Sequence, residues 1–206
     1  MNNIERLCSE SANAEQFARG YINYLSTLLG RLDVAAISAI INELEDARKH
    51  HNTIFIVGNG GSAATASHMA NDIGMDVLKK GEIDPPFRAF ALTDNVSLMT
   101  AIANDDGYHN IFVNQLRIYF KPGDKLIAIS ASGNSPNVVA AAEWISDRGG
   151  RVIGFTGFDG GKLKGISDLV VHVDTPKGEY GPVEDIHLVL DHLIANWLQN
   201  KVKDKY

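Results

Sequence analysis

The chain has 206 residues, a formal net charge of −6 and one cysteine, Cys8. This length accommodates one domain with a full hydrophobic core, one cysteine excludes an internal disulfide, and the acidic balance without a Lys/Arg-rich run argues against a nucleic-acid surface. No apolar run has the length of a signal-peptide core or a membrane span, so we expect a cytoplasmic protein with no membrane or nucleic-acid partner.

The first 50 residues predict a helical hairpin. Apolar residues recur at helical spacing over residues 4–29, Gly30 interrupts the pattern, and a second helix is expected over residues 33–50. A parallel sheet does not need such a preface. We therefore expect the hairpin to pack on the domain and on partner subunits.

A glycine-rich loop follows the apolar strand expected at residues 53–57, and residues 58–72 read GNGGSAATASHMAND. Glycines let the backbone approach a ligand, and Ser62 is expected to cap the following helix. Free N–H groups at a helix start attract anions, phosphate above all. The spacing matches neither the Walker nor the dinucleotide pattern. A tight turn without a ligand is the alternative interpretation.

His68 and Asp72 lie four residues apart on the same predicted helix, so both side chains project from one face. A histidine and a carboxylate at this spacing can hold a divalent metal or share acid and base work. The alternative is a solvated helix face. Partners from another part of the chain would decide between the two.

Four further apolar runs predict the remaining strands of a parallel sheet; they cover residues 88–92, 125–130, 151–156 and 169–173. Helices are expected over residues 96–103, 111–120, 138–147 and 182–201. Asp94 and Asn95 follow the second strand directly, which places them at the carboxyl end of the sheet.

The loop after the third strand, ASGNSPN at residues 131–137, is rich in small and hydroxyl-bearing residues. Ser130, Ser132 and Ser135 offer hydroxyls, and Pro136 suits the first position of a helix. Two such loops at one sheet edge predict one polar ligand. Hydroxyls and backbone N–H groups without a lysine fit a sugar phosphate better than a triphosphate. A loop that only caps its helix is the alternative.

The final predicted helix carries several polar side chains. Glu184 and His192 lie nearly on one stripe but are separated by roughly 12 Å along the helix axis, so only long, inclined side chains would bring them to one point. His187 and Asp191 form a neighbouring stripe. We expect that second stripe to face solvent or an interface.

Three motifs together resemble the sugar isomerase (SIS) family: GNGGSAA at residues 58–64, SASGNSPN at 130–137 and EDIHLVLDH at 184–192. The chain is most similar to the phosphoheptose isomerases, which interconvert sedoheptulose 7-phosphate and D-glycero-D-manno-heptose 7-phosphate. The resemblance covers nearly the whole chain. It implies a single α/β domain over residues 1–206, a three-layer α/β/α sandwich with a five-stranded parallel sheet, and a homotetramer with sites shared between subunits.

The resemblance also implies roles for individual residues. In relatives, the residues that match His68, Asp72, Glu184 and His192 surround a zinc ion, so zinc or another divalent metal is expected here. The residues that match Asp72 and His192 act as the acid/base pair. The positions implied to contact substrate are Asn59, Gly60, Gly61, Ser62, Asp94, Asn95, Ser130, Ser132, Ser135 and Glu184, with the four serines around the phosphate.

Three positions depart from the family pattern. Asp72 is one methylene shorter than the family Glu, Glu184 replaces a Gln and adds a negative charge, and Asp76 replaces an arginine that helps to hold substrate. Two histidines with two carboxylates make a better divalent-metal set than the family norm. We therefore expect the changes to favour metal binding and to alter which sugar phosphate is accepted.

The leading hypothesis is a metal-assisted aldose–ketose isomerase that acts on sedoheptulose 7-phosphate through an enediolate, with Asp72 as base and His192 as acid. An isomerase for a different phosphosugar is one alternative. The other is a non-catalytic SIS protein that binds a phosphosugar or a protein, such as the relative that associates with the bacterial replication initiator. Such a protein is expected to lose the acid/base positions, which this chain retains.

Overall fold

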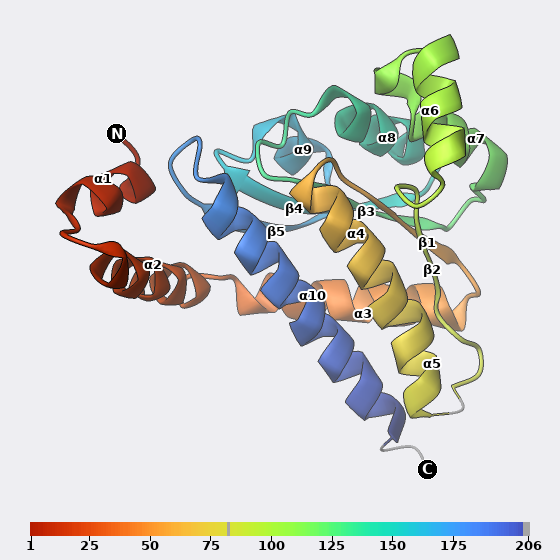
Figure 1. The fold of residues 1–206 in the computed structure, drawn as a ribbon. Coiled ribbons are helices and arrows are strands. Elements are labelled where there is room, and N and C mark those ends of the chain that lie inside the picture. Colours follow the sequence, from red (N-terminus) through yellow and green to blue (C-terminus); the bar gives the residue numbers. More distant parts are fainter. Residues whose placement is uncertain (82, 204–206) are drawn as a thin grey trace.

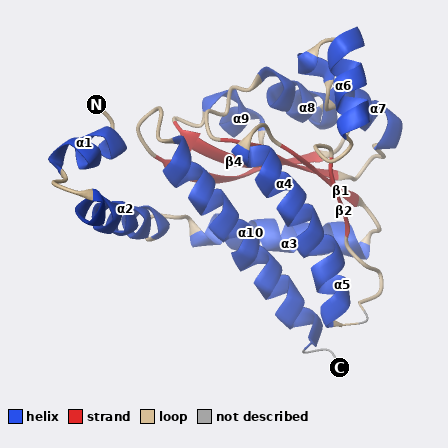
Figure 2. Cartoon of the chain, in the orientation of Figure 1, coloured by secondary structure: helices blue, strands red, loops and turns tan. Residues whose placement is uncertain are grey.

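The structure is a computed structural model and describes residues 1–81 and 83–203 of the chain. Its centre is a parallel sheet of five strands in the order β2-β1-β3-β4-β5 (Figures 1 and 2). The strands are β1 Thr53–Val57, β2 Arg88–Ala91, β3 Lys125–Ser130, β4 Arg151–Phe158 and β5 Leu169–Asp174. This confirms the predicted five-stranded parallel sheet.

Helices cover both faces of the sheet, as the three-layer prediction requires (Figure 1). One layer contains α3 Val34–Lys49, α4 Gly61–Asn71 and α10 Tyr180–Lys203. The other contains α6 Val96–Asp105, α7 Val113–Tyr119, α8 Pro136–Ser146 and α9 Gly161–Ile166. Because strand side chains alternate, Ile54 and Ile56 enter the first core and Phe55 and Val57 enter the second.

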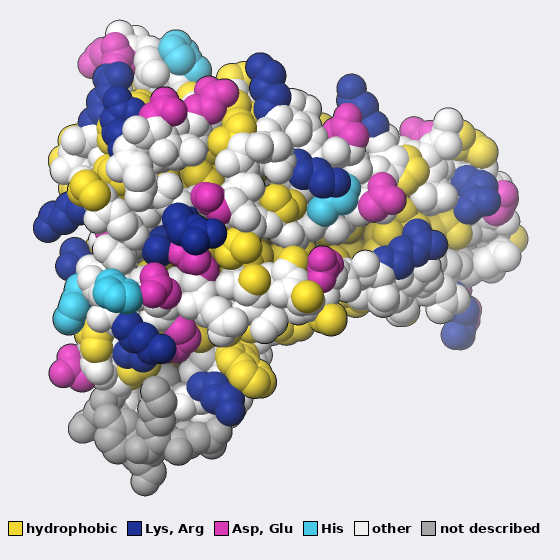
Figure 3. Space-filling view, turned by 180° about the vertical axis from the view of Figure 1, so that it is seen from behind, with side chains coloured by type: hydrophobic (Ala, Val, Ile, Leu, Met, Phe, Trp, Pro, Cys, Tyr) yellow, Lys and Arg dark blue, Asp and Glu magenta, His cyan; other side chains and the backbone are white. Residues whose placement is uncertain are grey.

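The N-terminal segment differs from the predicted hairpin, because residues 4–29 do not form one helix. The structure has α1 Asn3–Glu10 and α2 Ala14–Leu29, and the side chain of Asn13 caps the start of α2 by accepting from the backbone N–H of Gln16 at 3.0 Å. Asparagine favours such caps over helix interiors, which explains the break. Figures 1 and 3 show α1 and α2 as an arm beside the body of the domain.

The helix after β1 continues without a loop from α4 through the π-helical turn η1 Asp72–Asp76 into α5 Val77–Lys80. A short 3₁₀ turn, η2 Tyr108–Asn110, precedes α7. Within the described residues, no individual helix passes a length and hydropathy test for a membrane span; α2 and α3 pass it only as a pair that bends by 70°. Single π turns inside α-helices are frequent at functional sites. This one begins at Asp72.

Candidate active site

The loop between β1 and α4 is built on glycine. Gly60 has a φ of +54° and starts α4 without a side-chain cap, and a Cβ on Gly58 would lie 2.5 Å from the backbone oxygen of Ser62. Ser62 is therefore not the N-cap that the sequence predicted. Because Gly60 turns the chain into the helix, Ser62 falls in the first turn of α4, where it is 5 % exposed.

The serine-rich loop after β3 packs equally tightly. Gly133 has a φ of +62°, and a Cβ there would lie 1.9 Å from the carbonyl oxygen of Gly160. The hydroxyls of Ser130 and Ser135 lie 3.2 Å apart, and Ser132 Oγ accepts a hydrogen bond from the backbone N–H of Asn134 at 3.3 Å. The three serine hydroxyls thus belong to one compact loop at the start of α8, where free N–H groups favour an anion.

A reciprocal amide pair joins the two loops. Asn59 Nδ2 donates to Asn137 Oδ1 at 2.9 Å, Asn137 Nδ2 donates to Asn59 Oδ1 at 2.9 Å, and the hydroxyl of Tyr108 also donates to Asn59 Oδ1 at 3.0 Å. Asn137 is only 1 % exposed. The sequence analysis did not single out Asn137, because an asparagine in the first turn of a helix carries no pattern that reveals a long-range partner.

Glu184 lies against the glycine-rich loop. A Cβ on Gly61 would lie 2.2 Å from Glu184 Oε2, so the carboxylate sits beside the start of α4. Partial burial, with a smaller contribution from the charge of Asp185, raises the pKa of Glu184. An acidic side chain is electrostatically favourable at a helix N-terminus. This position is separate from the metal set in which Glu184 was expected.

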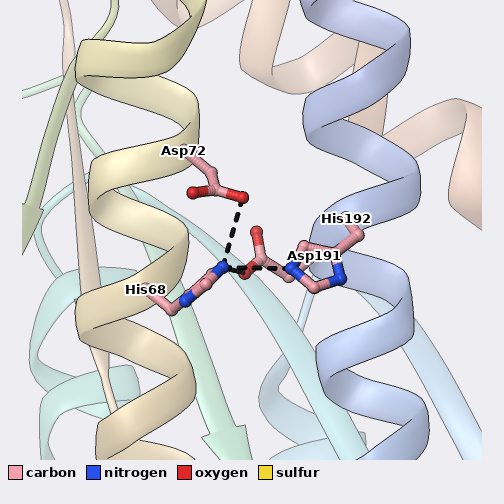
Figure 4. Close-up of side chains that lie close together, drawn as sticks. All are labelled: His68, Asp72, Asp191 and His192. Atoms are coloured by element: carbon pink, nitrogen blue, oxygen red, sulfur yellow. Dashed lines mark hydrogen bonds and ion pairs between the residues drawn. The ribbon is translucent and has the colours of Figure 1, made fainter.

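Four side chains converge where α10 crosses α4 and η1 (Figure 4): His68, Asp72, Asp191 and His192. We call them the His–Asp cluster. The Nε2 atoms of His68 and His192 lie 3.0 Å apart, and His68 Nε2 lies 3.4 Å from Asp72 Oδ2 and 4.0 Å from Asp191 Oδ2. One donor atom from each residue lies within 4.8 Å of the others. Three of the four predicted metal residues, His68, Asp72 and His192, thus come together. The fourth member of the cluster is Asp191 and not the predicted Glu184.

His187 and Asp191 do not face solvent, which corrects the sequence-based expectation. Both are fully buried. Burial raises the pKa of Asp191 to about 7, with a further contribution from Asp72, and burial lowers the pKa of His187 to about 4. The helical spacing placed them on one stripe correctly, but α10 packs with that stripe against the sheet and α4.

Asp94 and Asn95 lie beside edge strand β2. They line a cavity of about 910 Å³ together with Ser67 of α4. Asp94 accepts a hydrogen bond from the hydroxyl of Ser67, and Asn95 Oδ1 accepts from the backbone N–H of Leu98 at 3.0 Å. Asn95 therefore caps α6, whereas Asp94 is tied to the helix that carries His68.

The His–Asp cluster fits a divalent metal ion. Tetrahedral zinc with bonds of about 2.0–2.1 Å places its ligand atoms about 3.3 Å apart. The distances of 3.0 and 3.4 Å from His68 Nε2 to His192 and Asp72 are close to this value. Imidazole nitrogen and carboxylate oxygen are ligands that zinc and related divalent ions accept. Asp191 adds two buried oxygens that have no hydrogen-bond partner among the described residues.

Comparisons with known proteins identify the family of the chain. The SIS domain family model matches residues 17–157. A phosphoheptose isomerase of Rhodospirillum rubrum is 38% identical over 147 residues, which cover 71% of this chain and 76% of that protein. A phosphoheptose isomerase of Citrifermentans bemidjiense is 36% identical over 177 residues, which cover 84% of this chain and 90% of that protein. A solved phosphoheptose isomerase of Neisseria gonorrhoeae is 31% identical with a TM-score of 0.78, covering 91% of this chain and 96% of that one. The chain therefore belongs to the SIS domain family and, within it, to the phosphoheptose isomerases.

Proposed function

We propose that this chain is an aldose–ketose isomerase that converts sedoheptulose 7-phosphate to D-glycero-D-manno-heptose 7-phosphate. The observation that carries the proposal is the convergence of His68, Asp72 and His192, with contacts of 3.0 and 3.4 Å, in a chain whose relatives are phosphoheptose isomerases. The names of the relatives indicate the substrate. The three converging side chains include groups that can transfer protons.

Isomerisation removes a proton from the carbon next to a carbonyl and returns a proton to the neighbouring carbon through an enediolate. We assign Asp72 as the base and His192 as the acid. The two groups come from η1 and α10, and His68 contacts both of them. Asp72 is 8 % exposed, so little water competes with substrate for its carboxylate. Asp72, which is shorter than the family Glu, is the first residue of the π-helical turn η1.

The two loops at the carboxyl end of the sheet are proposed to hold the phosphate. Ser62, Ser130, Ser132 and Ser135 supply hydroxyls, and the backbone of Asn59, Gly60 and Gly61 lies at the start of α4. The amide pair between Asn59 and Asn137 supports this role because it fixes one loop relative to the other. Asp94, Asn95 and Glu184 are the proposed contacts to the sugar.

Zinc or another divalent metal is proposed as cofactor, with His68, Asp72 and His192 among its ligands. When bound, such an ion polarises the sugar carbonyl and stabilises the charge of the enediolate. In its own chain Glu184 lies against Gly61. Glu184 is not part of the His–Asp cluster, so its proposed place in the metal set rests on a site shared between subunits.

A homotetramer and a cytoplasmic location complete the proposal. Large apolar side chains of α10 are exposed, among them Leu188, Val189, Leu193 and Trp197. Ile22 on the arm is 61 % exposed, and Figure 3 shows the arm projecting from one side of the body of the domain. These surfaces support packing of α10 and the N-terminal helices on other subunits. The free, exposed Cys8 suits a reducing compartment.

The alternatives from the sequence remain distinguishable. A non-catalytic protein, including one that associates with the replication initiator, has no need for an acid/base pair, and here the pair and its histidine neighbour converge. An isomerase for a different phosphosugar is favoured by one observation: Asp76, which stands where relatives carry an arginine, forms an ion pair with Lys79 at 3.0 Å. An acidic side chain thus stands at the end of η1, four residues after Asp72, where relatives carry a positive charge.

The deciding experiment is an isomerisation assay with sedoheptulose 7-phosphate on purified protein as prepared, after chelation, and after addition of zinc. We expect turnover that chelation abolishes and zinc restores. Turnover that chelation leaves intact would refute the metal requirement. No turnover in any condition, with phosphosugar binding intact, would refute the proposed reaction in favour of a different sugar or a binding protein.

A further inference from the structure

Asp191 is the least satisfied carboxylate in the described part of the chain. Its side chain is fully buried, and neither of its oxygens has a hydrogen-bond partner there. Other buried acidic groups are satisfied: Asp124 accepts from the backbone N–H of Thr53 at 2.7 Å, and Glu179 accepts from the hydroxyl of Tyr24 at 2.5 Å. A buried carboxylate is stable only when a donor or a cation compensates it. Asp191 therefore requires a partner that the described residues do not supply.

The position of Asp191 indicates what that partner is. Its carboxylate points into the space between α4 and α10 that the other members of the His–Asp cluster also enter (Figure 4). Oδ2 lies 4.0 Å from His68 Nε2, which is too long for a hydrogen bond. A cation shared with the histidines satisfies both oxygens and both imidazoles.

We infer that Asp191 is itself a metal ligand, so that a single chain supplies a complete set of two histidines and two aspartates without Glu184. The inference rests on the metal site of the proposed function and changes its composition. Two carboxylates with two neutral imidazoles balance the charge of a divalent ion. By contrast, the set that the family resemblance implied depends on Glu184, which lies against Gly61.

A direct metal-binding measurement tests this assignment independently of turnover. Metal-free wild-type protein, Asp191→Asn and Glu184→Ala are titrated with Zn²⁺ against a chromophoric chelator, and Co²⁺ spectra of the three proteins report the ligand set. We expect Asp191→Asn to weaken zinc binding by at least about 10- to 100-fold, the range known for groups that support metal ligands, and to change the Co²⁺ spectrum. Glu184→Ala, which removes every possible metal-binding atom of that side chain, is the control on the same helix and is expected to retain wild-type affinity.

The metal-free variants also need a folding control, because Asp191 is buried. Asn is close in size to Asp and carries no charge, so Asp191→Asn is expected to fold, which circular dichroism and thermal unfolding verify. Wild-type zinc affinity in Asp191→Asn, or no zinc binding by the wild-type chain, would overturn the inference. Loss of zinc affinity in Glu184→Ala, with wild-type affinity in Asp191→Asn, would overturn the inference in favour of the set that the family resemblance implied. Absence of turnover with sedoheptulose 7-phosphate, with these affinities as expected, would refute the proposed substrate only.

Discussion

His187 and Asp191 are both fully buried polar residues of α10, but their surroundings differ. Asp191 enters a cluster of metal-type donors, whereas His187 lies beneath the sheet with Nε2 3.4 Å from the carbonyl oxygen of Thr156. The ring of His187 also contacts Phe155 edge-on, with centroids 5.7 Å apart. His187 thus serves as a neutral core residue, whereas the proposed acid/base roles belong to Asp72 and His192.

The first prediction at this scale concerns the acid/base pair. Asp72→Asn and His192→Ala are each expected to lower kcat with sedoheptulose 7-phosphate by at least about 100-fold, because each removes one proton-transfer group. Steady-state kinetics measures the effect. The exposed His50, which lies at the end of α3, provides the control: His50→Ala is expected to retain activity. Wild-type kcat in both site variants would refute the assignment.

The second prediction concerns pH. Burial lowers the pKa of His187 from 6.5 to about 4, so between these values the unfolded chain binds a proton that the folded chain does not. The free energy of unfolding therefore falls as the pH drops from about 6.5 to about 4, by roughly 3 kcal/mol in total. His187→Gln removes this contribution, so its urea-derived stability is expected to depend less steeply on pH.

Comparing variant with wild type isolates the contribution of His187. The lowered pKa of His172 acts in the same direction, and the raised pKa of Asp191, about 7, acts in the opposite direction because the folded state then binds the extra proton. His172 and Asp191 are present in both the metal-free wild type and metal-free His187→Gln, so their contributions cancel in the comparison. Parallel stability curves from pH 4.5 to 7 would show that His187 is not responsible for the slope.

At the scale of elements, the loops after β1 and β3 form one unit. The Asn59–Asn137 pair joins the two loops, and the backbone at Gly133 packs on the loop that starts α9, where Leu163 N–H donates to Gly133 O at 2.9 Å. The serine loop is therefore fixed from both sides. Preorganised hydroxyls and N–H groups bind an anion without a cost for ordering the loop.

The third prediction tests this packing. Gly133→Ala is expected to lower the free energy of unfolding by about 2 kcal/mol or more, because the positive φ strains alanine and its Cβ would lie 1.9 Å from Gly160 O. Gly165→Ala is the matched control, since nothing lies within 4 Å of its Cβ and alanine favours the helix. Urea unfolding compares the two. Equal stability of both variants would contradict the described loop contact.

At the scale of the whole molecule, the chain order explains where the site forms. His68 and His192 are 124 residues apart, and they meet because α4 and α10 cover the same face of the sheet (Figure 1). Helix α4 joins the glycine-rich loop, which is proposed to hold phosphate, to His68 and, through η1, to Asp72. The arm and the exposed apolar side chains of α10 are the surfaces through which the proposed tetramer would assemble.

Much of the fold was determined by the sequence alone. Continuous apolar runs such as TIFIV and KLIAIS identify buried strands, because both faces of a parallel sheet are covered. Glycine and serine loops directly after those strands identified the candidate phosphate site. The motif resemblance correctly predicted the family. The predicted single helix over residues 4–29 was wrong, because Asn13 forms a cap and starts a new helix.

Only the tertiary structure decided which polar groups of α10 enter the site. Helical periodicity places His187 and Asp191 on one stripe, but periodicity does not reveal that the sheet and α4 cover that stripe. It also does not show that Glu184 lies against Gly61 or that Asn59 pairs with Asn137. These contacts depend on how two helices and two loops, distant in sequence, settle against the same sheet. The sequence determines which chemical groups are available, and tertiary packing determines which of them come into contact.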